Sequence, residues 1–272
     1  MRLAGWLGLA AVATPVLAAG VTGAREVVRA DTARRRGVAT RDGVPVPEPS
    51  FGLGVAAGID ALLAAPMPLL SSLGSAEDYA LASAELDAAV DYYGEAGWLD
   101  DPQRRHRRPG APEHVRIQTL APGLELAHFD SGWRPEPGEP GGQRWQSLRA
   151  NERVPVRLLR HPGGPRPWLI AVHGQGMGRG SDVKMLRVRR LHEELGVNVA
   201  LPVLPLHGPR ACGLSPAHQF ASNIFATNNV LGLTQSVWDV RRLLQWLRDD
   251  QRAPAVGLLG VSLGSYVINL LS

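Results

Sequence analysis

Short apolar segments alternate with amphipathic segments from residue 111 to the end of the chain. Residues 168–174 (WLIAVHG) and 255–262 (AVGLLGVS) are nearly continuous apolar runs, which are typical of strands buried on both faces of a sheet. Residues 181–196 and 231–250 instead place their apolar side chains at helical spacing. Strands that alternate with helices of this length predict βαβ units, and therefore an α/β fold with a mostly parallel sheet and helices on both faces.

The chain before this region is predicted to be helical. Residues 51–70 are expected to form a packed or surface-lying helix that ends near Ala65, because prolines follow. Residues 75–98 have helical apolar spacing and the capping signal of Ser75 with Asp78.

The N-terminal segment, residues 3–21, is apolar for about the length that crosses a bilayer, although it is rich in Ala and Gly. Arginines follow it closely, which favours a downstream side held in the cytoplasm. We therefore expect residues 1–22 to contact a membrane as an anchor or a surface helix. A signal peptide cleaved after residues 16–18 (VLA), with export, and a plain cytoplasmic helix stay open as alternatives.

These patterns divide the chain into three predicted regions. Residues 1–45 are an apolar segment with a basic linker, residues 46–110 are a helical region, and residues 111–272 are an α/β domain.

Composition narrows the function classes. The formal charge of +4 depends on arginine, since Lys184 is the only lysine, and the basic run at 104–108 has no interleaved aromatic residues that could stack on bases. No nucleic-acid partner is expected. Cys212 is the only cysteine, so no intrachain disulfide forms. No cluster of residues has metal-ligand spacing, so neither a metal nor a cofactor is expected.

The strongest chemical motif is Gly260-Val261-Ser262-Leu263-Gly264, which fits the pattern G-x-S-x-G between a predicted strand and a predicted helix. A serine on so sharp a turn takes a strained backbone, and side chains two residues away on either side would collide. The hydroxyl of Ser262 would then stand clear of the turn as a nucleophile.

A second glycine-rich element, residues 173–180 (HGQGMGRG), follows a predicted strand. Acyl transfer needs backbone N–H groups that point at the developing oxyanion, and such a loop lets a carbonyl oxygen approach them. One donor would be the N–H of Leu263, and the other the N–H of Gln175 or, alternatively, of Gly176. A dinucleotide-binding motif is discounted, because its third glycine would fall at Arg179.

Together these motifs resemble the α/β-hydrolase superfamily, which contains serine esterases, lipases and peptidases. The resemblance covers about residues 114–272, where HGQGMG, PLHGPR and GVSLG follow the third, fourth and fifth strands. It implies a serine hydrolase that acts on small-molecule carboxylic esters, or on lipid esters if the N-terminus meets a membrane. His173 is expected to brace its loop rather than to act as a general base, and a hydrogen-bonded structural role is the alternative to substrate contact for His207.

The residues expected at the site are Ser262 as nucleophile, the oxyanion donors Leu263, Gln175 and Gly176, the glycines Gly260, Gly264 and Gly174, and the substrate-lining side chains His173, His207, Arg210 and Cys212.

The chain departs from the family pattern in one respect. The family places its acid and its histidine after the serine, whereas all eight histidines of this chain precede Ser262, which only ten residues follow. A hydroxyl without a base is a poor nucleophile at neutral pH. We therefore expect the chain to be the N-terminal part of a hydrolase. The alternative is a non-catalytic binding or scaffold module that keeps the fold and associates with a membrane.

Overall fold

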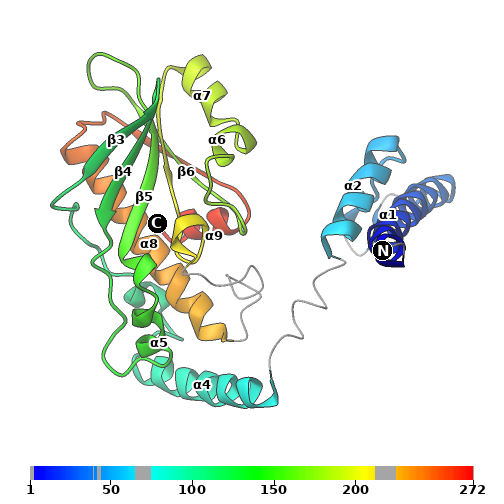
Figure 1. Ribbon diagram of the computed structural model, residues 1–272, viewed down its shortest axis with the longest axis horizontal. Coiled ribbons are helices and arrows are strands. Elements are labelled where there is room, and N and C mark those ends of the chain that lie inside the picture. Colours follow the sequence, from blue (N-terminus) through cyan, green and yellow to red (C-terminus); the bar gives the residue numbers. More distant parts are fainter. Residues whose placement is uncertain (1–2, 39, 42–43, 65–74, 212–224, 272) are drawn as a thin grey trace. The chain divides into compact units, whose positions relative to one another are not determined.

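The structure of the protein is a computed structural model that describes residues 3–38, 40–41, 44–64, 75–211 and 225–271 (Figure 1). It contains two compact units, Met1–Leu73 and Gly74–Ser272. The predicted helical region is thus divided between the two units.

The first unit is a helical hairpin. Its elements are α1 (Leu3–Arg35), the short antiparallel pair β1 (Thr40–Arg41) and β2 (Val44–Pro45), and α2 (Phe51–Ala64). Within the residues that the structure describes, no helix is both long and apolar enough to cross a membrane. The side chains of residues 1–18, on which much of the predicted membrane contact depends, lie outside the described part of the chain.

The second unit begins with α4 (Ala76–Glu95), which starts at the predicted capping signal. The hydroxyl of Ser75 accepts a hydrogen bond from the N–H of Asp78, and the Asp78 carboxylate accepts one from the N–H of Ser75. This capping box satisfies donors that a helix start leaves without an intrahelical partner. The 3-10 helix η1 (Pro102–Arg105) follows.

Six strands form one sheet in the order β3-β4-β5-β7-β6-β8. They are β3 (Arg116–Ala121), β4 (Leu124–Asp130), β5 (Arg153–Leu159), β6 (Trp168–Val172), β7 (Asn198–Pro202) and β8 (Val256–Gly260).

The sheet is mixed, which corrects the prediction of a mostly parallel one. The pairs β3–β4, β4–β5 and β5–β7 are antiparallel, and only β6–β7 and β6–β8 are parallel. The cause lies in the connections. β3 and β4 are joined by a two-residue turn at Gly123 (φ +70°), which permits only an antiparallel pair, whereas helices connect the three parallel strands.

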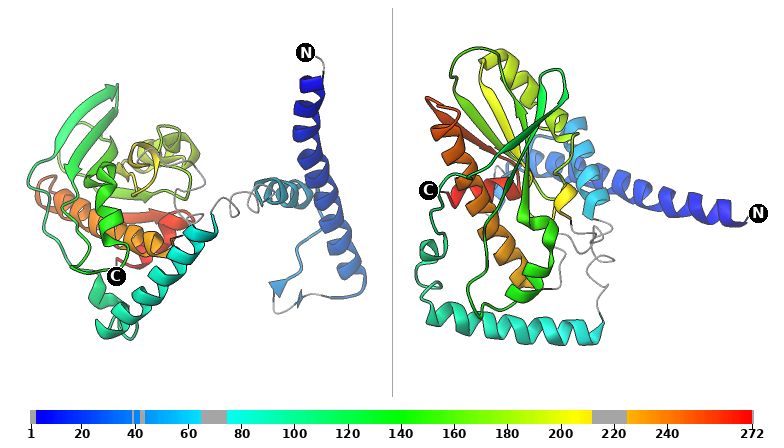
Figure 2. Two further views of the ribbon diagram at one scale, coloured as in Figure 1. Left: turned by 60° about the horizontal axis from the view of Figure 1, so that its bottom comes forward. Right: turned by 60° about the vertical axis from the view of Figure 1, so that its left-hand side comes forward.

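Helices cover both faces of the sheet, as the alternation of elements predicts (Figures 1 and 2). On one face, α8 (Ala226–Asp249) and α9 (Leu263–Asn269) pack against Ile170 and Val172 of β6. On the other face, α6 (Asp182–Met185) and α7 (Val188–Leu195) pack against Ala171. Successive residues of one strand thus contribute to two cores, because their side chains alternate between the faces. The remaining short helices are α5 (Gly142–Ser147), η2 (Arg149–Glu152) and η3 (Gly208–Arg210).

Strand β8 lies at the edge of the described sheet, although its apolar sequence predicts a strand buried on both faces. Within the described residues, β8 pairs with β6 alone. Leu258 of β8 is 40% exposed, whereas Ile170 of β6 is fully buried. The edge position explains the difference, since nothing in the described part of the chain covers the outer side of β8.

Candidate active site

The predicted nucleophile, Ser262, forms the turn between β8 and α9. Its backbone has φ 51° and ψ −118°, a conformation that L residues rarely adopt, and the residue is exposed. The turn is closed by hydrogen bonds from Gly264 N–H to Val261 O (2.9 Å) and from Ser265 N–H to Ser262 O (2.8 Å). Such strain in a non-glycine residue persists only where the surrounding structure imposes it, and it concentrates at functional sites.

The two glycines that flank Ser262 are required by close backbone contacts. A Cβ atom on Gly264 would lie 2.1 Å from the carbonyl oxygen of Val172, and one on Gly260 would lie 2.6 Å from the carbonyl oxygen of Gly264. The sequence predicts a collision between side chains at these positions. The structure shows that the collision would be with backbone, because the turn presses against the end of β6.

The loop after β6 lies beside the serine turn. β6 and β8 are neighbours in the sheet, and Val261 N–H donates to Val172 O (3.1 Å) just before the turn. A Cβ atom on Gly174 would lie 3.3 Å from the Cβ of Ser262. Gln175 follows directly and is exposed, so the backbone region predicted to hold an oxyanion lies close to the serine. Gly176 has φ +75°, a left-handed conformation that glycine adopts without strain.

His173 braces this loop from the inside. Its Nε2 accepts a hydrogen bond from Leu204 N–H (3.1 Å), so the ring proton is on Nδ1, which donates to the carbonyl oxygen of Gly174 (2.7 Å). The ring is 2% exposed, and burial lowers its pKa. A buried neutral ring with both nitrogens engaged in this way ties the end of β6 to the segment that follows β7.

Asp182 shapes the other end of the loop, a role that the sequence pattern did not reveal. Its carboxylate accepts hydrogen bonds from the N–H groups of Gly178 (2.6 Å) and Arg179 (3.0 Å), and the residue is 3% exposed. In the sequence, Asp182 lies at the start of the predicted helix 181–196, a position that indicates only a helix cap. Residues 178–180 (Gly-Arg-Gly), which favour a turn, come shortly before Asp182, and this spacing could have indicated that its carboxylate caps the loop.

The loop after β7 packs backbone to backbone against the loop after β6. A Cβ atom on Gly208 would lie 2.1 Å from the carbonyl oxygen of Gly178. His207 precedes this contact, its Nδ1 lies 2.7 Å from Pro205 O, and its ring centroid is 5.1 Å from that of His173. The two loops therefore form one continuous layer beside Ser262.

Three of the four predicted substrate-lining side chains are interior residues. His173, His207 and Arg210 are each at most 2% exposed, and their hydrogen bonds go to backbone carbonyls and to a buried carboxylate. The structure thus corrects the expectation that His207 and Arg210 line a surface, because their polar groups find partners in the interior, whereas the ring of His173 braces its loop as expected. The fourth, Cys212, lies outside the described residues.

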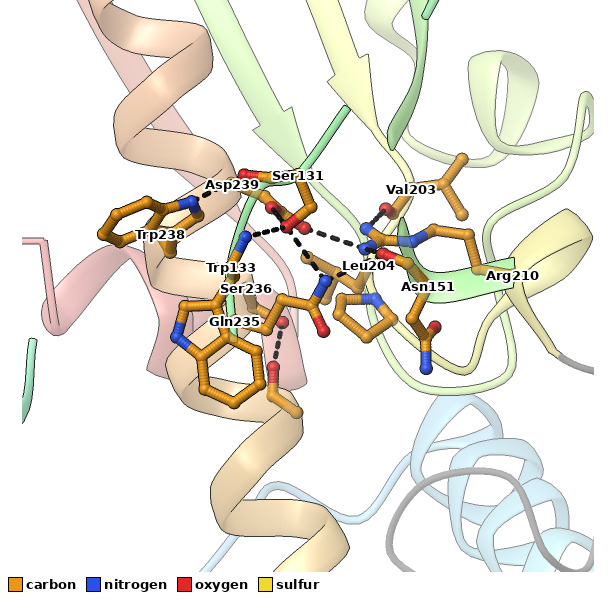
Figure 3. Close-up of polar contacts among 12 residues, drawn as sticks. Ser131, Trp133, Asn151, Val203, Leu204, Arg210, Gln235, Ser236, Trp238 and Asp239 are labelled. Carbon is orange, nitrogen blue, oxygen red and sulfur yellow. Dashed lines mark hydrogen bonds and ion pairs between the residues drawn. The ribbon is translucent and has the colours of Figure 1, made fainter. Parts of the chain in front are cut away.

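Arg210 is the centre of a buried polar network that holds the loop after β7 (Figure 3). Its Nη2 donates to a carboxylate oxygen of Asp239 (2.9 Å) and to Asn151 O (2.6 Å), and its Nη1 donates to Val203 O (2.8 Å). Arg210 and Asp239 have side chains that are 1% and 2% exposed. Burial raises the pKa of the Asp239 carboxyl, and the guanidinium of Arg210 opposes that change.

The same network continues from α8 to the segment after β4. The Ser131 hydroxyl donates to Asp239 (2.5 Å) and accepts from the Gln235 amide (2.9 Å), which also donates to Asn151 O (2.8 Å). Trp145 Nε1 donates to the Gln235 side-chain oxygen (2.8 Å). Buried polar groups that have partners rigidify their surroundings, and the hydrogen bonds above join three segments of the chain, although the amide nitrogen of Asn151 has no partner among the described residues. We infer that the network fixes the layer of loops beside Ser262.

No group of three or more metal-ligating side chains occurs within the described ranges. The described part of the candidate site comprises a strained serine, a glycine-rich loop and a buried polar network.

The buried His207 is expected to make the free energy of unfolding depend on pH in the acidic range. Burial, with a contribution from His173, lowers the His207 pKa from 6.5 to about 4. The unfolded chain therefore takes up a proton before the folded chain does, and stability that is present above pH 6.5 is lost as the pH falls toward 4. The loss is about 3 kcal/mol for this group.

His207→Gln is expected to flatten the fall of the unfolding free energy between pH 6.5 and 4, measured by urea denaturation. His114→Gln, at an exposed position, is the matched control and should leave the slope unchanged. Parallel curves for the parent and His207→Gln would contradict this assignment.

Comparisons with known proteins give relatives without an assigned activity. No protein-family model matches the chain. The chain is 38% identical over 235 residues to Uncharacterized protein MT2702 of Mycobacterium tuberculosis (strain CDC 1551 / Oshkosh). It is 37% identical over 235 residues to Uncharacterized protein Rv2627c of Mycobacterium tuberculosis (strain ATCC 25618 / H37Rv). Each match covers 85% of this chain and 56% of the relative, so the chain spans little more than half the length of these proteins.

A solved structure is also similar. The cold-adapted esterase from an Arctic intertidal metagenomic library is 13% identical, with a TM-score of 0.38 over 60% of each chain.

Proposed function

We propose that the chain carries the nucleophile and the oxyanion-binding loop of a serine hydrolase of the α/β-hydrolase type, with carboxylic esters as substrates. The observation that carries this proposal is the backbone of Ser262, at φ 51° and ψ −118° between β8 and α9. The G-x-S-x-G motif supports a nucleophilic serine only where the serine lies on a strained strand-to-helix turn, and Ser262 lies on such a turn. The cost of such a conformation, on the order of 1–3 kcal/mol, argues for a function of this residue.

In the proposed reaction, Ser262 Oγ attacks the acyl carbon of the ester. A bond forms between Oγ and this carbon, the serine proton passes to a base, and the carbonyl π electrons move onto the carbonyl oxygen. The N–H groups of Leu263 and of Gln175 or Gly176 would donate hydrogen bonds to this oxyanion. When the intermediate collapses, the alkoxide leaves with a proton, and water then hydrolyses the acyl-enzyme.

The base and its acid are proposed to lie outside these 272 residues. The buried His173 is already committed to two backbone groups, and the rings of His161 and His192 stack on each other and contact backbone carbonyls. The outer side of β8 offers a place for further strands that would carry a histidine to the serine. This chain would therefore carry the nucleophile and the oxyanion-binding loop of the catalytic site, without its base and acid.

A fluorophosphonate probe tests the proposal. The 272-residue chain should be labelled on the order of a thousandfold more slowly than the chain joined to its downstream reading frame, because acylation lacks its general base. In the longer protein the label should map to Ser262 by peptide mass spectrometry and disappear in Ser262→Ala. Ser181→Ala, at an exposed serine that follows the glycine-rich loop, is the matched control and should keep the label.

Two outcomes would contradict this account. Rapid labelling of Ser262 in the 272-residue chain would mean that a group within the chain serves as the base. A folded longer protein that remains unlabelled would favour the non-catalytic binding or scaffold module.

A further inference from the structure

The helical hairpin of the first unit is held together by backbone contact between its helices. A Cβ atom on Gly23 of α1 would lie 2.2 Å from the carbonyl oxygen of Gly54 of α2, and one on Gly58 would lie 3.1 Å from Ala19 O. Small residues spaced four apart let two helices approach this closely, which is a packing mode favoured where lipid surrounds helices. Among the described side chains of the hairpin, large apolar residues such as Phe51, Val28 and Ile59 therefore lie mostly outside the contact between the two helices.

Those side chains face outward along one side of the hairpin. An apolar groove of about 650 Å³ runs between the helices on this side, flanked by Gly20, Ala24 and Val28 of α1 and by Phe51, Val55 and Ile59 of α2. Each set follows the four-residue helical repeat, so each forms one stripe. Phe51 is 89% exposed, Val28 63% and Ile59 51%. A contiguous apolar patch of this kind marks an interaction surface.

The distribution of charge indicates which partner fits this face. Residues 3–24 contain no charged side chain, whereas five arginines lie between residues 25 and 36. Arg29, Arg34 and Arg35 pair with the acidic residues Glu26, Glu48 and Asp31, and the further arginines leave this end of α1 net positive. One acidic residue, Asp60, follows the groove residue Ile59 and opposes the effect.

We propose that the α1–α2 hairpin binds the surface of an anionic phospholipid bilayer. The face that carries Phe51, Val55 and Ile59 lies among the acyl chains just below the head groups, and the arginines of α1 contact the lipid phosphates. Amphipathic helices with aromatic and aliphatic residues on one face and arginine beside it bind membranes in this way. The mode is surface binding and does not require a helix that crosses the bilayer. It is independent of the proposed hydrolase activity.

Vesicle flotation of the full chain tests this inference. Binding should be detectable on vesicles of phosphatidylcholine mixed with phosphatidylglycerol and weaker on phosphatidylcholine alone. The triple variant Phe51→Ser, Val55→Ser and Ile59→Ser should lower the partition coefficient at least about tenfold. The matched control replaces three exposed apolar residues of α4 with serine: Leu81, Leu86 and Val90. It should bind as the parent does.

Three results would overturn the proposal. Equal loss in both triple variants would show that general apolar content governs binding. A dimer in lipid-free solution that only the α2 variant abolishes, by light scattering, would assign the face to a second copy. Unchanged flotation together with a lower melting temperature of the α2 variant would assign it to the second unit of the same chain.

Discussion

Asp239→Ala is expected to lower the free energy of unfolding by about 3–5 kcal/mol, one of the two largest effects that we predict for a single substitution. The variant leaves the guanidinium of Arg210 buried, at 1% exposure, without the carboxylate that faces it at 2.9 Å. It also removes the acceptor of the Ser131 hydroxyl. An uncompensated buried charge is far more costly than the loss of a pair as a whole.

Urea denaturation followed by circular dichroism provides the measurement. Glu194→Ala, which breaks the exposed pair with Arg190 on α7, is the control and should cost at most about 0.5 kcal/mol. The double variant Arg210→Met with Asp239→Leu should recover part of the loss, since it removes both charges. A loss below about 1 kcal/mol in Asp239→Ala would show that the network does not hold the loops.

Gly264→Ala is expected to destabilise the protein by about 3 kcal/mol or more, although a Gly→Ala change inside a helix ordinarily stabilises. The added methyl would meet the carbonyl oxygens of Val172 at 2.1 Å and of His173 at 2.8 Å, and neither belongs to a flexible side chain. The turn would have to move away from β6, which carries Ser262 away from the loop that contains Gln175.

The control for this variant is Gly180→Ala, because no atom lies within 4 Å of the position where its Cβ would be. Thermal unfolding of both variants gives the comparison, and Gly180→Ala should change the melting temperature by no more than about 2 °C. If Gly264→Ala were as stable as the parent, the close approach of the turn to β6 would be wrong.

The sequence predicted the strand-to-helix turn at Ser262, which depends on local backbone geometry. Gly260, Ser262 and Gly264 sit between a strand and a helix, and a turn of this kind requires small residues whatever the rest of the fold does. The proximity of the loop after β6 also follows from general rules, since the carboxyl ends of parallel neighbours meet at one edge of a sheet.

Features of the structure that depend on contacts between residues distant in sequence could not be predicted. Arg210 was expected to face a substrate because its loop occupies the place of a loop that lines the active site in the family that the chain resembles. Its partner Asp239 is 29 residues away on another element, so the ion pair could not be predicted from local sequence. Asp239 has Gln235 and Ser236 as helical neighbours on α8, so the sequence pattern does not distinguish it from a carboxylate on a solvent-exposed face. The direction of β5 could not be predicted either, since the apolar pattern of a strand does not differ between parallel and antiparallel pairing.

The network around Arg210 also has a consequence for the order in which the protein folds. The contact between Ser131 and Asp239 spans 108 residues, and that between Ser131 and Gln235 spans 104. Contacts between residues so distant in sequence close large loops of unfolded chain, and they form slowly for that reason. The segment from Val203 to Arg210 has local hydrogen bonds, such as that from Arg210 N–H to His207 O (2.8 Å), but the Arg210 guanidinium pairs with Asp239 of α8. This segment is therefore expected to reach its final shape only after α8 has docked on the sheet. We therefore expect the layer of loops beside Ser262 to be the last region of this unit to gain protection from hydrogen exchange during refolding.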